Sequence, residues 1–173
     1  MSIVIRTERK EDYSQVWDVN FQAFGNREDE AKLVDRIRLS EYFIPNLSIV
    51  AEINNEIIGH ILLSKAEVFD TDMVHEVIVL APIAVKPGHQ NQGIGKQLIL
   101  EAFNRCKDMG YFIVMLIGHP TYYPKFEFKQ ARQFGLELTQ FEVSDDVFMV
   151  CELKSNELSK IKGELKYPKA FLG

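Results

Sequence analysis

The stretch that decides the fold reads VKPGHQNQGIGK, residues 85–96. It follows a run of strand-forming residues, 74–85, and leads into a helical periodicity that starts at Gly93. Glycines let the backbone approach a ligand closely, and the unpaired amides at the start of a helix attract anions. The segment therefore predicts a binding loop for a phosphate or a pyrophosphate.

The spacing of the glycines separates this loop from the common nucleotide-binding motifs. A P-loop needs Lys and then Ser or Thr directly after Gly93, but Ile94 and Gly95 stand there. A dinucleotide-binding loop needs a third glycine where Leu98 stands. The residues Ile94 and Gly95 thus argue against a nucleotide hydrolase. The pattern that fits is Gln/Arg-x-x-Gly-x-Gly/Ala, filled by residues 90–95.

Around the loop, the hydrophobic pattern alternates between strand and helix periods. Helical spacing predicts helices over residues 10–24, 28–39 and 93–109. Strands are predicted over residues 3–6, 47–53, 56–68, 74–85, 111–117, 134–142 and 147–153, with Asn54-Asn55 as a hairpin turn. This order indicates the α/β (α+β) class, with a mixed, mostly antiparallel central sheet flanked by helices. The tail from Lys154 carries mixed charge and fits no predicted element.

Composition limits the class of protein. The 173 residues predict a single domain, residues 1–173, because a domain typically has roughly 100–200 residues. The net charge of −5 argues against a nucleic-acid partner. Cys106 and Cys151 lack disulfide or metal-ligand spacing, so we expect reduced thiols and no metal site. Without a signal-peptide pattern or an apolar run of about 18 residues, we expect a cytoplasmic protein with no membrane partner.

Two further segments, together with the loop, make the sequence resemble the GNAT superfamily of acetyl-CoA-dependent N-acetyltransferases. Residues 80–87, followed by residues 90–95, look like that family's acetyl-CoA segment. After the next predicted strand, residues 122–128 resemble its Tyr-x-x-x-Gly-Phe segment. The order of elements matches over residues 3–153, and Gly118-His119-Pro120 with the following Tyr-Tyr pair looks most like a bacterial single-domain branch.

The resemblance implies direct transfer of an acetyl group from acetyl-CoA, the co-substrate, to a primary amine in a ternary complex. Loop amides would hold the pyrophosphate, and the preceding strand end would pair with the pantetheine. The implied cofactor-binding residues are Ile83, Ala84, Val85, Gln90, Asn91, Gln92, Gly93, Ile94, Gly95 and Lys96. The amide of Ala84 or Val85 would donate to the thioester oxygen. Lys96 either adds charge near the phosphates or is a solvated lysine.

By the same resemblance, Tyr123 is the acid that protonates the departing thiolate, because it stands four residues before the family's glycine position. A tyrosine hydroxyl, with a reference pKa of about 10, is protonated at neutral pH and can donate. The alternative is a packing aromatic, which is our interpretation of Tyr122. Glu127 occupies the glycine position in this chain. If that position needs a positive φ, glutamate strains it by roughly 1 kcal/mol.

The sequence leaves the general base open. Glu76 and His119 are rival catalytic candidates, and surface polar residues are the alternative for both. The acceptor, a small-molecule or peptide amine, should bind between residues 17–38 and residues 68–76. Acidic side chains in the first range suit a cationic amine, although a solvated helix face explains them too. A non-catalytic acetyl-CoA-binding regulatory module is the alternative function, and the assembly state, a homodimer included, is left open.

Overall fold

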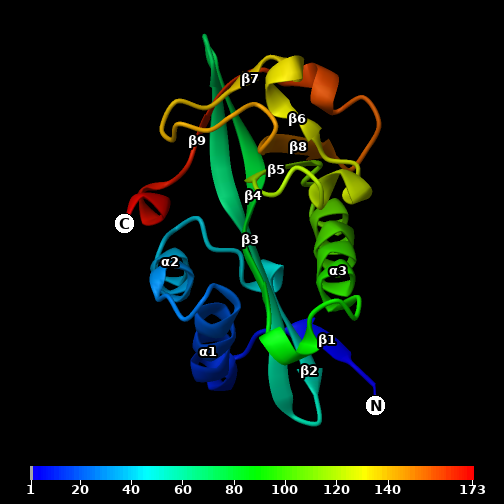
Figure 1. Ribbon diagram of the computed structural model, residues 1–173. Coiled ribbons are helices and arrows are strands. Elements are labelled where there is room, and N and C mark those ends of the chain that lie inside the picture. Colours follow the sequence, from blue (N-terminus) through cyan, green and yellow to red (C-terminus); the bar gives the residue numbers. More distant parts are fainter. Residues whose placement is uncertain (1) are drawn as a thin grey trace.

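The computed structural model describes residues 2–173 and is built on a nine-stranded sheet (Figure 1). Its main path runs in the order β1-β2-β3-β4-β5-β8-β6. The strands are β1 (Val4–Thr7), β2 (Ser48–Ile53), β3 (Glu56–Asp70), β4 (Met73–Val85), β5 (Ile113–Ile117), β6 (Lys129–Gln130), β7 (Leu136–Glu137), β8 (Phe148–Glu152) and β9 (Gly163–Lys166). β4 runs parallel to β5 and β7 parallel to β9, whereas the remaining pairs described are antiparallel. The mixed, mostly antiparallel sheet predicted from the sequence is confirmed.

Helices cover both faces of the sheet. α1 (Tyr13–Ala23) and α2 (Asp29–Arg38) lie on one side of β3 and β4, and α3 (Ile94–Asp108) lies on the other (Figure 1). Consecutive residues of a strand point to opposite faces. β3 therefore contributes Leu62 to the core under α1 and α2, and Ile61 and Leu63 to the core under α3.

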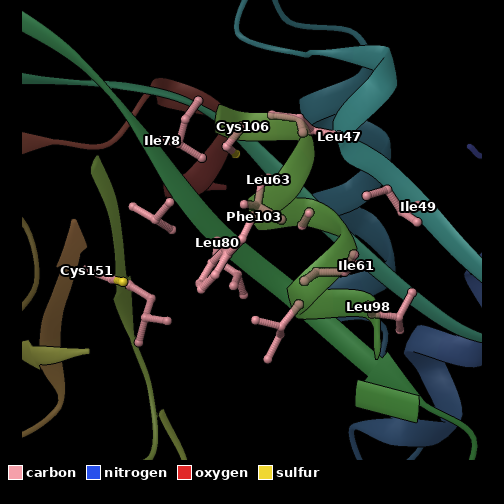
Figure 2. Close-up of a cluster of buried hydrophobic side chains, with 14 of the residues drawn as sticks. Leu47, Ile49, Ile61, Leu63, Ile78, Leu80, Leu98, Phe103, Cys106 and Cys151 are labelled. Carbon is pink, nitrogen blue, oxygen red and sulfur yellow. The ribbon is translucent and has the colours of Figure 1, made fainter. Parts of the chain in front are cut away.

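α3 begins directly after the glycine loop. Gly93 is its N-cap at φ 82°, and Gly110, also at φ 82°, follows its end. Glycine adopts this left-handed conformation without the steric cost of a Cβ. Figure 2 shows side chains of α3 pointing toward those of the neighbouring strands. The helix predicted over residues 93–109 is confirmed, and its buried residues are Ile94, Leu98, Ile99, Ala102, Phe103 and Cys106.

β4 and β5 pair over a short length and then diverge. The paired residues are 78–79 of β4 and 114–115 of β5. Toward Val85, the register of β4 against β3 shifts, so that Ala81 and Pro82 form a bulge. Proline donates no backbone hydrogen bond, which suits a strand that leaves its neighbour. The edge of β4 that follows the bulge is therefore open on the side of β5.

The C-terminal tail contains a strand that its sequence did not predict. β9 pairs antiparallel to β3 and parallel to β7, and Leu165 of β9 is fully buried. The strand predicted over residues 134–142 is wrong in extent, because β7 has only two residues and follows a 3-10 helix over Ala131–Phe134. Gly135, at φ 78°, ends that helix. Within residues 2–173, no helix is long and apolar enough to cross a membrane.

Candidate active site

The glycine loop, the open end of β4 and the segment after β5 surround a cavity of about 750 Å³, called here the loop cavity. The predicted cofactor-binding residues line it, with the exception of Gln92, which is exposed. The segment after β5 adds lining residues to which the sequence gave no role in binding, namely Tyr122, Lys125 and Phe126. They belong to the segment that resembles Tyr-x-x-x-Gly-Phe, so this motif in the sequence could have identified them as lining residues.

The start of α3 presents unpaired amides at the loop cavity. Gln97 donates to the carbonyl of Gly93 at 3.1 Å, so the amides of residues 93–96 precede the first intrahelical donor. Gln90 fastens the loop to β4, because its Nε2 donates to the carbonyl oxygen of Val85 at 3.1 Å. These amides and the positive end of the helix dipole favour a bound phosphate.

The open edge of β4 carries backbone amides that no strand uses. The amide of Lys86 donates to the carbonyl of Ile58 on β3 at 2.8 Å. Because amides alternate sides along a strand, that of Ala84 also faces β3, whereas those of Ile83 and Val85 face the open edge. Of the two amides that were expected to donate to the thioester oxygen, that of Ala84 points toward β3 and is not available. The amide of Val85 points toward the open edge and remains a candidate donor.

Tyr122 lies over the start of α3. A Cβ on Gly95 would lie 3.0 Å from the Tyr122 hydroxyl oxygen, so the absence of a side chain at Gly95 lets this tyrosine approach the helix. The Tyr122 ring packs edge-on against Phe126, with centroids 5.4 Å apart. Burial raises the pKa of Tyr122. The interpretation of Tyr122 as a packing residue is thus incomplete, because its hydroxyl lies at the loop.

A second cavity, of about 620 Å³, lies where β4 and β5 diverge and is called here the gap cavity. Ile83 and His119 line both cavities, so the two spaces adjoin at these residues. The other lining residues are Phe24, Glu30, Leu33, Leu80, Ala81, Pro82, Ile117, Gly118, Pro120, Tyr123 and Val147. Of the region expected to bind the acceptor, residues 17–38 contribute three of these lining residues. Residues 68–76 lie before the part of β4 that pairs with β5 and line no part of the gap cavity.

Tyr123 extends into the gap cavity from a short 3-10 helix, Tyr123–Phe126. A Cβ on Gly118 would lie 2.4 Å from Cε2 of Tyr123, so glycine at the end of β5 makes room for the ring. Phe128 packs edge-on against that ring, with centroids 5.7 Å apart. Burial raises the pKa of Tyr123 to about 12. Its hydroxyl is therefore protonated at neutral pH and can donate a hydrogen bond.

Glu127 ends that short helix in the left-handed conformation, at φ 68° and ψ 22°. The sequence predicted strain at this position if it needed a positive φ, and it does. A non-glycine residue there costs roughly 1–2 kcal/mol in backbone sterics. The left-handed turn thus forms here with glutamate at the position where the resemblance implies glycine.

Glu76 lies away from both cavities. It is exposed on β4 and lines a separate hollow of about 530 Å³ together with His75 and Tyr111. Ile83 lies seven positions after Glu76, and seven steps along a strand span on the order of 20 Å. Glu76 is therefore not placed to act on an acceptor in the gap cavity. His119, which is exposed and lines both cavities, is the candidate base that the structure brings to the site.

A glycine loop that starts a helix, beside an open strand end, is the arrangement that the resemblance implied for an acetyl-CoA-dependent transferase. The chain belongs to the acetyltransferase (GNAT) family, whose family model matches residues 8–124. It is 36% identical over 123 residues to the uncharacterized N-acetyltransferase YjhQ of Escherichia coli (strain K12), covering 69% of this chain and 66% of that protein. It is 27% identical over 142 residues to the uncharacterized N-acetyltransferase YhbS of the same strain, covering 82% and 83%.

Solved structures agree with this assignment. The crystal structure of YhbS from Escherichia coli in complex with CoA has a TM-score of 0.90 and 26% identity, and the match covers 99% of this chain and 92% of that chain. A GNAT family acetyltransferase from Brucella melitensis in complex with acetyl-CoA has a TM-score of 0.78 and 26% identity, covering 98% of both chains. The predicted family, fold class and acyltransferase activity class are confirmed, and these structures support acetyl-CoA as the co-substrate.

Proposed function

We propose that this chain transfers the acetyl group of acetyl-CoA to a primary amine by direct attack in a ternary complex. The observation that carries the proposal is the junction of the two cavities at Ile83 and His119, beside the open edge of β4. Acetyl-CoA would occupy the loop cavity, with its pantetheine along that edge. The amine would enter through the gap cavity and meet the thioester at the junction.

The transfer needs a free amine, a polarised carbonyl and a protonated leaving group. The acceptor ammonium gives one proton to His119 or water, and its nitrogen then attacks the carbonyl carbon of the thioester. The amide of Val85 donates to the oxyanion that forms. As the carbon–sulfur bond breaks, the nitrogen loses its second proton, and the sulfur takes one from Tyr123, which recovers it from solvent. The products are the acetylated amine, CoA thiol and one released proton.

Cofactor binding is tested at Gly93, where charge can be changed without a change of shape. Gly93→Asp places a carboxylate at the amides that would hold the pyrophosphate, whereas Gly93→Asn is nearly isosteric and neutral. Both side chains tolerate the left-handed conformation of this position better than other residues do. Calorimetry should find acetyl-CoA bound at least about tenfold more weakly by the Asp variant than by the Asn variant, the effect of about 1.4 kcal/mol of repulsion. Equal affinities would place the pyrophosphate elsewhere.

Turnover is tested by release of free CoA thiol from acetyl-CoA in the presence of candidate amines, with mass spectrometry of the acetylated product. We expect thiol release that depends on the amine. Binding of acetyl-CoA without release by any amine of the panel would contradict the transferase proposal. That outcome would instead favour the regulatory module that the sequence left as the alternative.

A further inference from the structure

Given the proposed transferase function, on which this inference rests, we infer that the acceptor is an apolar monoamine without a carboxylate, and that Glu30 binds its ammonium group. Apart from Glu30, His119 and the hydroxyl of Tyr123, the side chains that line the gap cavity are aliphatic or aromatic. Among its lining residues, the side chains with a carboxyl or imidazole group are Glu30 and His119.

Glu30 projects from the first turn of α2 and is half-buried at the cavity wall. Its Oε1 is shielded from solvent and accepts no hydrogen bond from the described residues. Its Oε2 lies 3.9 Å from the guanidinium of Arg27, a side chain that is 63% exposed. The Glu30 carboxylate is thus partly desolvated, and its negative charge is only weakly balanced by the exposed Arg27. Such a group gains from a charged hydrogen-bond donor, and an ammonium bound in the cavity supplies one once the partly exposed carboxylate turns toward it.

The composition of the wall sets the substrate class. One carboxylate matches one ammonium group, and the apolar walls match an aromatic or aliphatic body. No Lys or Arg is among the lining residues, so the carboxylate of a free amino acid would be buried without a partner. The second ammonium group of a polyamine would likewise lie against the apolar wall without a charged partner. Both groups of amine should be poor acceptors.

The matched substrates for the test are 2-phenylethylamine, L-phenylalanine amide, L-phenylalanine and spermidine. The first two keep one ammonium and an aromatic body, the third adds a carboxylate, and the fourth adds charge and removes the ring. Rates of amine-dependent thiol release should favour the first two by at least about tenfold in kcat/KM over the others. An acceptor preference for phenylalanine or spermidine would overturn the inference while leaving the transferase function intact.

The matched variants are Glu30→Gln and Glu28→Gln. Glu28 lies two residues before Glu30, at the N-cap of α2. It is exposed, pairs with Lys32 at 2.8 Å and does not line the gap cavity. Glu30→Gln should raise KM for 2-phenylethylamine roughly 10–100-fold, the effect of losing a charged hydrogen bond, with KM for acetyl-CoA and the melting temperature unchanged. Glu28→Gln should leave KM for the amine within about twofold. Equal effects of the two variants would overturn the role of Glu30. If no amine releases thiol, the proposed function itself fails.

Discussion

Tyr122 and Tyr123 are adjacent in the chain, yet they line different cavities. Tyr122 lies at the loop cavity and Tyr123 at the gap cavity. This separation predicts different kinetic effects when one hydroxyl is removed. General acid catalysis contributes typically 10²–10⁴-fold, so Tyr123→Phe should lower kcat by at least about tenfold with little change in KM for acetyl-CoA. Tyr122→Phe should instead act mainly on KM for acetyl-CoA.

Steady-state kinetics with an amine found by thiol release separates these outcomes. Tyr111→Phe is the control, because Tyr111 lines the separate hollow beside Glu76. A larger loss of kcat in Tyr122→Phe than in Tyr123→Phe would assign the acid role to Tyr122. If neither variant loses rate, the thiolate departs without help from a tyrosine.

Glu127 permits a prediction about stability at the same scale. Glycine at this left-handed position would relieve roughly 1–2 kcal/mol of steric cost and lose roughly 0.5–1 kcal/mol to the greater freedom of the unfolded chain. Glu127→Gly should therefore stabilise the protein by up to about 1 kcal/mol, which corresponds to about 2–4 °C in melting temperature. Glu127→Gln, which removes the charge but keeps the strain, should change little. Equal melting temperatures for the Gly variant and the wild type would show that the turn carries no net strain.

At the scale of elements, the sequence predicts local features better than features that depend on distant strands. α3 and its loop follow from the spacing of Gly93 and Gly110 and from a clear helical period, which are local signals. The sequence placed the candidate base Glu76 at the site, but the structure places it elsewhere. The reason is that the bulge at Ala81 and Pro82 and the divergence of β4 from β5 decide which part of β4 lines the site. A single sequence contains no signal for that divergence.

β9 was missed for a different reason. Its four residues lie among charged side chains, so the period of two is too short to recognise. Leu165 is nevertheless 0% exposed, between β3 and β7. Leu165→Ala should lower the free energy of unfolding by roughly 2–5 kcal/mol. Leu172→Ala, at a side chain that is 53% exposed, should stay within about 0.5 kcal/mol. Denaturant unfolding of both variants measures the difference, and equal stabilities would mean that the tail does not contribute to the cooperative core.

At the scale of the whole molecule, a buried polar network ties the N-terminal segment to the sheet. His60 of β3 is fully buried, with Asn20 Nδ2 3.1 Å from its Nδ1 and Ser48 Oγ 3.0 Å from its Nε2. Ser48 donates to Glu8 at 2.9 Å, and two nitrogens of Arg38 donate to the same carboxylate. Since the Asn20 nitrogen only donates, we assign Nδ1 of His60 as an acceptor and place its proton on Nε2, facing Ser48.

This arrangement makes the stability of the fold depend on pH through His60. A second ring proton would point at the Asn20 donor, and burial, with Arg38 nearby, lowers the pKa of His60 to about 3. An unfolded histidine has a pKa of about 6.5, so below that pH the unfolded chain binds more protons than the folded one. The free energy of unfolding is thus fully retained above about pH 6.5 and falls as the pH drops toward the folded value, by at most about 1.4 kcal/mol per pH unit from this residue. Urea unfolding between about pH 5.5 and about pH 7 should find this slope in the wild type and a shallower one in His60→Gln, in a range above the reference pKa values of Asp and Glu, about 3.9 and 4.3. The same slope in both proteins would mean that His60 keeps its protonation state when the chain unfolds.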